Sequence, residues 1–158
     1  MNVVDERQRY IEAIKFPETR ACIIFDLDGT LVPKGETELT EAVVVSLRAL
    51  QKRHEVWILT NGFDRRRAER IAEMLQIPLA RTGRKPFGVL PGSPGLRKIV
   101  VGDKLLTDGL AAARGGATFM HIRRKVSSDE SFLEKLICAL DDVLFACSKV
   151  IHAYPVTT

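Results

Sequence analysis

The chain has 158 residues, of which 46% are hydrophobic and 28% charged, and its net charge at pH 7 is +4. These values are typical of one globular domain, so we take residues 1–158 as a single domain with its own core. No apolar run reaches the roughly 20 residues that cross a bilayer, and the N-terminus lacks the basic and then apolar order of a secretory signal.

The hydrophobic pattern predicts helices and strands in alternation. An N-terminal helix is expected within residues 1–17, over 5–15, with Asp5 as its N-cap and Pro17 after its end. Further helices are predicted at 37–53, 64–75, 105–114 and 128–152. Strands are predicted at 21–25, 55–59, 77–80, 98–101 and 117–122.

This order of elements predicts a doubly wound, Rossmann-like α/β fold. We expect a mostly parallel five-stranded sheet with helices on both faces. Residues 86–97 interrupt the pattern with three prolines and three glycines, so this crossover is predicted to be a loop. In such sheets a site forms at the carboxyl ends of the strands.

The most informative motif is Asp-Leu-Asp-Gly-Thr, directly after the predicted strand 21–25. Residues two apart on an extended chain point the same way, so Asp26 and Asp28 can face one centre. Two carboxylates held this close repel each other, which indicates a bound cation or a tuned proton. Gly29 permits a tight turn, and Thr30 adds a hydroxyl and a backbone donor.

Three further motifs follow in order along the chain: Thr60-Asn61-Gly62, Lys85-Pro86, and Gly102-Asp103 with Asp108 after it. Together with the first motif, they resemble the haloacid dehalogenase-like (HAD) superfamily of phosphohydrolases. The resemblance spans about residues 21–122. The stretch Val101–Asp108 is similar to capless subfamily III, which includes phosphatidylglycerophosphate phosphatases.

The resemblance implies a Mg²⁺-dependent phosphatase. Asp26 would be the nucleophile that forms an aspartyl-phosphate. Asp28 would protonate the leaving alkoxide and later activate water. The protein ligands of Mg²⁺ would be Asp26, the backbone carbonyl of Asp28, and Asp103.

The resemblance also implies how the phosphoryl group is bound. The Thr60 hydroxyl and the backbone N–H groups of Asn61 and Gly62 would bind its oxygens, close to a helix start. Lys85 would neutralise its charge, and Asp108 would orient Lys85 or support the metal ligands. Taken singly, these residues also fit a turn, a helix-turn acid or a solvated lysine, so the assignment depends on the four motifs together.

The spacing of the motifs leaves no room for a cap domain, because residues 33–56 and 64–84 each hold one predicted helix. An open site suits a bulky substrate such as a lipid head group, a nucleic-acid end or a protein. Basic residues are predicted at its rim: Arg65, Arg66, Arg67, Arg81, Arg84, Arg123, Arg124 and Lys125. They favour a polyanion or an anionic membrane surface, and charge that only confers solubility explains them equally well.

The predicted C-terminal helix is more apolar than a one-sided surface helix requires. Packing over the sheet is the simpler interpretation, and a homo-oligomer interface or membrane contact is the alternative. The three histidines are scattered, so no zinc site is predicted, and no nucleotide-binding glycine motif occurs. Cys22, Cys138 and Cys147 lack C-x-x-C spacing, which predicts reduced core thiols and a cytoplasmic protein, peripheral at the membrane if the rim binds lipid.

The sequence therefore predicts a phosphomonoester hydrolase acting on a phosphorylated, bulky anionic substrate. A phosphatidylglycerophosphate-like lipid comes first, and polynucleotide ends or sugar phosphates come next. A non-catalytic binding module with the same fold is the alternative from another class. It is disfavoured because every acid of the motifs and Lys85 are present.

Overall fold

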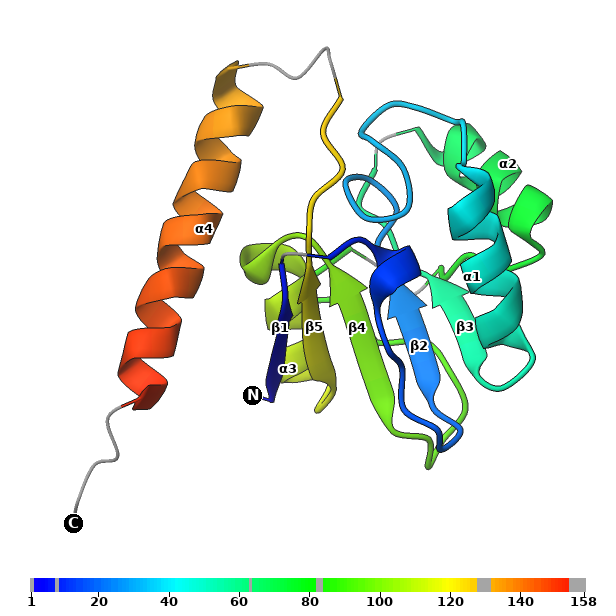
Figure 1. The fold of residues 1–158 in the computed structure, drawn as a ribbon, viewed down its shortest axis with the longest axis horizontal. Helices are drawn as coiled ribbons and strands as arrows, with labels where there is room; N and C mark the ends of the chain where they lie inside the picture. Colours follow the sequence, from blue (N-terminus) through cyan, green and yellow to red (C-terminus); the bar gives the residue numbers. More distant parts are fainter. Residues whose placement is uncertain (1, 8, 63, 82–83, 128–131, 154–158) are drawn as a thin grey trace.

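The structure is a computed structural model that describes residues 2–7, 9–62, 64–81, 84–127 and 132–153, without the side chains of 132–134 and 147–153. Its single sheet has five parallel strands in the order β1-β5-β4-β2-β3 (Figure 1). They are β1 (Val3–Glu6), β2 (Cys22–Phe25), β3 (Glu55–Ile58), β4 (Lys98–Gly102) and β5 (Thr118–Ile122). The predicted doubly wound α/β fold with a five-stranded sheet is confirmed.

Helices cover both faces of the sheet. Helices α1 (Glu41–Gln51) and α2 (Arg65–Leu75) pack on one face, and α3 (Leu110–Arg114) packs on the other. A wider, π-helical turn, η2 (Leu105–Gly109), leads into α3. Helix α4 (Phe132–Ala153) lies along the side of the sheet where β1 forms the edge (Figure 1).

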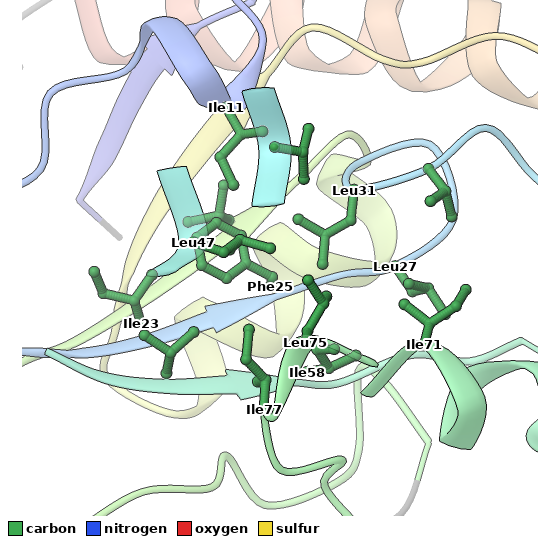
Figure 2. Close-up of a cluster of buried hydrophobic side chains, with 14 of the residues drawn as sticks. Ile11, Ile23, Phe25, Leu27, Leu31, Leu47, Ile58, Ile71, Leu75 and Ile77 are labelled. Atoms are coloured by element: carbon green, nitrogen blue, oxygen red, sulfur yellow. The ribbon is translucent and has the colours of Figure 1, made fainter. Parts of the chain in front are cut away.

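The two cores arise from the alternation of side chains along the strands. In β2, Ile23 and Phe25 belong to the core under α1 and α2, whereas Cys22 and Ile24 belong to the core on the α3 face. Figure 2 shows the first of these cores, with side chains of β2 and β3 gathered against those of α1 and α2. Since β2 is buried on both faces, its position in the middle of the sheet is fixed, and so is the position of the residues that follow it.

The predicted N-terminal helix over 5–15 is wrong. Residues Val3–Glu6 form the edge strand β1, which pairs with β5, and only Ile11–Ala13 form a short 3₁₀ turn, η1. The β-branched pair Val3-Val4 fits a strand, and the ladder offered by β5 outweighs the local helical pattern. Ile11 is nevertheless buried, as the spacing predicted.

The predicted strand 77–80 is reduced to a single parallel bridge between Leu79 and Ile58. Pro78 has no N–H group to extend the ladder, which limits pairing to two hydrogen bonds with Ile58. The fifth strand of the sheet is therefore β1. The predicted loop at 86–97 is confirmed, because this crossover holds no helix or strand.

Within the described residues, α1 is the one helix between β2 and β3, and α2 is the one helix between β3 and Lys85, so no cap domain is present there. Among these residues, no helix has the length and apolar character needed to span a membrane.

Helix α4 does not pack its broad apolar stripe over the sheet as the simpler interpretation expected. Phe145 is buried against the α3-face core. Exposed side chains make up the rest of the described stripe: Leu136, Ile137, Leu140, Val143 and Leu144.

A buried carboxylate anchors α4 to the start of η2. Asp141 is 3% exposed, and its two oxygens accept hydrogen bonds from the backbone N–H groups of Leu105 at 2.7 Å and Leu106 at 2.8 Å. These donors lie in the first helical turn and have no partner within that turn, so the carboxylate satisfies groups that would otherwise be buried unpaired.

We predict that Asp141→Asn lowers the free energy of unfolding by about 1–3 kcal/mol, because an amide nitrogen cannot accept from a buried N–H group. The control is Asp142→Asn at the neighbouring position, whose side chain is 67% exposed and whose change is expected within about 0.5 kcal/mol. Urea unfolding of both variants measures this, and equal losses would contradict the anchoring role of Asp141.

Candidate functional site

A cavity of about 450 Å³ opens where β2, β3 and β4 end, and Asp26, Thr60 and Asp103 line it from these three strand ends. Strand β2 lies between β3 and β4, so the chain passes from β2 to β3 on one side and then crosses to β4 on the other side of β2. Such a switch point leaves a crevice at the carboxyl ends of the strands. The motifs that are dispersed in sequence are thus brought to one place by the strand order.

Lys85 is the centre of a buried charge cluster. Its Nζ donates to Asp26 Oδ1 at 2.5 Å and also to Asp108 Oδ1, and its side chain is 3% exposed. On the other side of Asp26, Lys104 Nζ donates to Asp103 Oδ2 at 2.8 Å. With all three carboxylates ionised, the two ammonium groups leave the cluster with one net negative charge.

Burial and these contacts shift the protonation equilibria of the cluster. Burial by itself would lower the pKa of Lys85, but the carboxylates of Asp108 and Asp26 outweigh it, so the pKa is raised and the ammonium form persists. Burial raises the pKa of Asp108, against the opposing effect of Lys85. Burial also raises the pKa of Asp103 to about 7, with Lys104 opposing and Asp26 adding to the rise.

The carboxylates of Asp26, Asp103 and Asp108 each offer an oxygen within 4.8 Å of the others. Hard oxygen ligands at this separation, with net negative charge, fit a divalent cation such as Mg²⁺. Asp108 is fully buried and does not line the cavity, and its oxygens already accept from Lys85 and from the backbone N–H of Lys104. The cavity side of a cation site is therefore formed by Asp26 and Asp103, with Asp108 placed to orient Lys85.

Asp28 lines the same cavity, but its carboxylate turns away from this cluster. Asp28 Oδ1 accepts from Arg67 Nη2, and Arg67 Nη1 donates to the carbonyl oxygen of Glu36 at 2.6 Å. A Cβ on Gly62 would lie 2.9 Å from Asp28 Oδ2, which places this carboxylate beside the turn after β3. The Asp28 carboxylate is therefore not one of the grouped carboxylates that could bind the cation, and it lies close to Thr60, Asn61 and Gly62, which were predicted to bind the phosphoryl group.

The turn after β3 positions Lys85 as well as lining the cavity. Asn61 Oδ1 accepts from the backbone N–H of Lys85 at 2.7 Å, and Asn61 Nδ2 donates to the Lys85 carbonyl at 2.9 Å. The Gly62 N–H, predicted as a phosphoryl donor, here donates to Thr60 Oγ1 at 3.0 Å. This reciprocal Asn61 contact holds Lys85 in place although a loop, and not a helix, follows it.

Gly29 allows the first and fourth motifs to meet. Its φ is +85°, in the left-handed region that favours glycine, and a Cβ there would lie 2.5 Å from Asp103 Oδ2. The Thr30 hydroxyl, in contrast, is buried and has no hydrogen-bond partner among the described residues, so Thr30 adds nothing to the cavity.

The residues predicted to form a basic rim differ in their exposure to solvent. Arg65, Arg66, Arg81, Arg84 and Arg123 are exposed. Arg67 is 6% exposed and bound to Asp28, and Arg124 lines the cavity and donates to Cys138 Sγ. Lys125 is half-buried and lies 3.7 Å from a carboxylate oxygen of Glu12.

Sequence reasoning missed the pairing of Arg67 with Asp28, the pairing of Lys104 with Asp103, and the cavity-lining position of Ile137 and Cys138 on α4. The helical position of Arg67, next to the buried Ala68, was the available signal for its burial. Cys138 is half-buried beside the cavity and is not the core thiol that we predicted, whereas Cys22 is buried. The Cys147 side chain lies outside the described residues.

Comparisons of the chain with models of protein families, with curated proteins and with solved structures found no match.

The raised pKa of Asp103 predicts how the stability of the metal-free protein depends on pH. The folded-state pKa of about 7 lies above the ordinary value of 3.8, so stability is fully present below pH 3.8 and is lost as pH rises toward about 7. Asp103→Asn mimics the protonated acid. In EDTA, wild type is expected to match this variant in acid and to fall below it by on the order of 4 kcal/mol above about pH 7.

Urea unfolding at a series of pH values measures this difference, with Asp142→Asn as the exposed-acid control. A constant difference between wild type and Asp103→Asn across the whole interval would show that Asp103 does not hold its proton in the folded state.

Proposed function

We propose that the chain is a Mg²⁺-dependent phosphomonoester hydrolase that acts through an aspartyl-phosphate on Asp26. The observation that carries this proposal is the position of Asp26. Its carboxylate lines the cavity, Lys85 Nζ lies 2.5 Å from one of its oxygens, and Asp103 lies within range of a shared cation. The nucleophilic carboxylate of Asp26 thus contacts the ammonium group of Lys85 and borders the site for a divalent cation.

In the first step, an oxygen of Asp26 attacks phosphorus and the bond from phosphorus to the leaving oxygen breaks. The leaving alkoxide takes a proton from Asp28, which stands two residues away with its carboxylate beside the turn after β3. Lys85 neutralises charge on the transferring phosphoryl group and holds Asp26 in position.

In the second step, Asp28 takes a proton from a water molecule, whose oxygen attacks phosphorus. The bond between phosphorus and the Asp26 oxygen breaks, inorganic phosphate leaves, and the Asp26 carboxylate is regenerated. Mg²⁺, when bound by Asp26, Asp103 and the Asp28 carbonyl, supplies further positive charge against the phosphoryl oxygens.

The substrate class within this reaction follows from the open cavity. Without a cap among the described residues, a bulky substrate can reach Asp26, and Lys34, Lys104 and Arg124 line the approach. We therefore keep bulky anionic phosphomonoesters, with a phosphatidylglycerophosphate-like lipid first, as the proposed substrates. The rival proposal is a non-catalytic binding module, and hydrolysis assays decide between the two.

Asp26→Asn is expected to reduce Mg²⁺-dependent hydrolysis of p-nitrophenyl phosphate by on the order of 10³-fold or more, because an amide is a poor nucleophile. Asp28→Asn should instead let the phosphorylated protein accumulate. In the first step p-nitrophenolate leaves without a proton, whereas in the second step the attacking water still needs Asp28 as a base. Phosphate release and mass spectrometry of acid-quenched protein measure the two effects, with Asp142→Asn as control. Full activity of Asp26→Asn would remove the nucleophile, and a wild type inactive on a broad phosphate panel would favour the binding module.

Arg67→Gln is predicted to lower kcat by about 10- to 100-fold, because Asp28 loses the partner that fixes its carboxylate. The loss in kcat/KM, which reports the first step, should be larger for an alkyl phosphate than for p-nitrophenyl phosphate, since only the alkoxide needs the proton of Asp28 in that step. Arg66→Gln is the matched control, because Arg66 is the exposed neighbour on the same helix. If both variants behave alike, or if the two substrates are affected equally, Arg67 does not act through Asp28.

A further inference from the structure

One wall of the cavity is formed by α4. Ile137 and Cys138 line the cavity, while Asp141 and Phe145 lie one and two turns farther along the face that carries Ile137, because residues four apart share a helix face. Asp141 is 3% exposed and Phe145 is 1% exposed, yet Ile137 is 46% exposed. One face of α4 therefore packs against the rest of the domain at Asp141 and Phe145 and lines the cavity at Ile137.

Several contacts hold this wall in place. Besides the two hydrogen bonds to Asp141, the Phe145 ring packs edge-on against His121 with centroids 4.4 Å apart, and the Arg7 guanidinium lies 4.3 Å from the Phe145 centroid. His121 Nε2 in turn lies 2.9 Å from the Asp103 carbonyl oxygen. The position of Ile137 is thus tied to the segment that carries Asp103.

Arg124 closes the gap between this wall and the first motif. It follows β5, donates to Cys138 Sγ, and passes close enough to Gly29 that a Cβ there would lie 3.2 Å from Arg124 Cγ. The cavity is therefore continuous from the residues beside Asp26 to the side chain of Ile137.

Ile137 differs in chemistry from the rest of this lining. Among the described residues that line the cavity, it alone has a purely hydrocarbon side chain, and apart from Cys138 the others are polar, charged or glycine. Asp26, Thr60 and Lys85 surround the phosphoryl position, and Lys34, Lys104 and Arg124 line the approach to it. The part of a substrate that reaches α4 is consequently the leaving group, and a contact there removes apolar surface of Ile137 from water.

We propose that Ile137 is a specificity-determining residue that favours phosphomonoesters whose leaving alcohol carries an apolar chain, a lipid included, over those of small polyols. The proposal rests on the proposed function and adds to it the chemistry of the leaving group. An apolar chain gains the contact with Ile137, whereas a small polyol has no apolar surface to place against it.

The test compares hexyl phosphate with glycerol 1-phosphate, using phosphate release with Mg²⁺ present. Wild type should have the higher kcat/KM for hexyl phosphate, and Ile137→Asn should reduce the ratio of the two kcat/KM values by roughly tenfold. Leu136→Asn is the matched control, because Leu136 is also 46% exposed on α4 but does not line the cavity. Ile137→Phe, which keeps an apolar surface, should retain the preference.

The proposal is overturned if wild type hydrolyses both esters without preferring hexyl phosphate, if Ile137→Asn lowers kcat/KM for both substrates equally, or if Leu136→Asn has the same effect. Failure of the proposed function is distinguished by calorimetry on Asp26→Asn, which needs no turnover. If this variant binds hexyl phosphate more tightly than inorganic phosphate, and the added substitution Ile137→Asn removes the difference, the apolar contact at Ile137 is supported even if wild type hydrolyses neither ester. Equal binding of both ligands rejects it.

Discussion

The ammonium group of Lys85, buried between Asp26 and Asp108, is the interaction on which the rest of the site depends. Removing these charges from water costs several kcal/mol per ion, and only close pairing offsets that cost. The pairing in turn requires the end of β2, the loop at Lys85 and the η2 turn to meet within hydrogen-bond distance. The reciprocal contact of Asn61 with the Lys85 backbone and the anchoring of η2 by Asp141 are the supports that make this meeting possible.

The charge balance of the cluster explains why a cation belongs with the proposed chemistry. Three ionised carboxylates and two ammonium groups leave one negative charge, which repels a phosphate dianion. A divalent cation reverses the sign and attracts the same dianion. The raised pKa of Asp103 has the same origin, because a buried carboxylate beside other carboxylates is stabilised either by a proton or by a cation.

Asp26 and Asp28 are close in sequence, but the fold places their carboxylates in different surroundings. Asp26 shares the buried cluster with Lys85, whereas Asp28 is held by Arg67 beside the turn after β3. This separation suits one acid for attack and the other for proton transfer. Helix α4 forms one wall of the cavity, where the described residues contain no cap domain. The helix is held there by its contacts at Asp141 and Phe145.

The pattern of residues along the chain was enough to predict β2, β3, β4, β5 and the loop at 86–97, because buried strands and Pro/Gly-rich loops are local signals. The resemblance carried by the four motifs added the expectation that Asp26, Lys85, Asp103 and Asp108 meet at the strand ends. The pattern could not predict that Val3–Glu6 would pair with β5 and that Asp5 would not begin a helix, since that ladder exists only once β5 is in place. Nor could it identify Asp28 as the partner of Arg67 or place Ile137 at the cavity. Burial of a charge and the side on which a helix docks depend on partners distant in sequence, which come together only when the chain has folded.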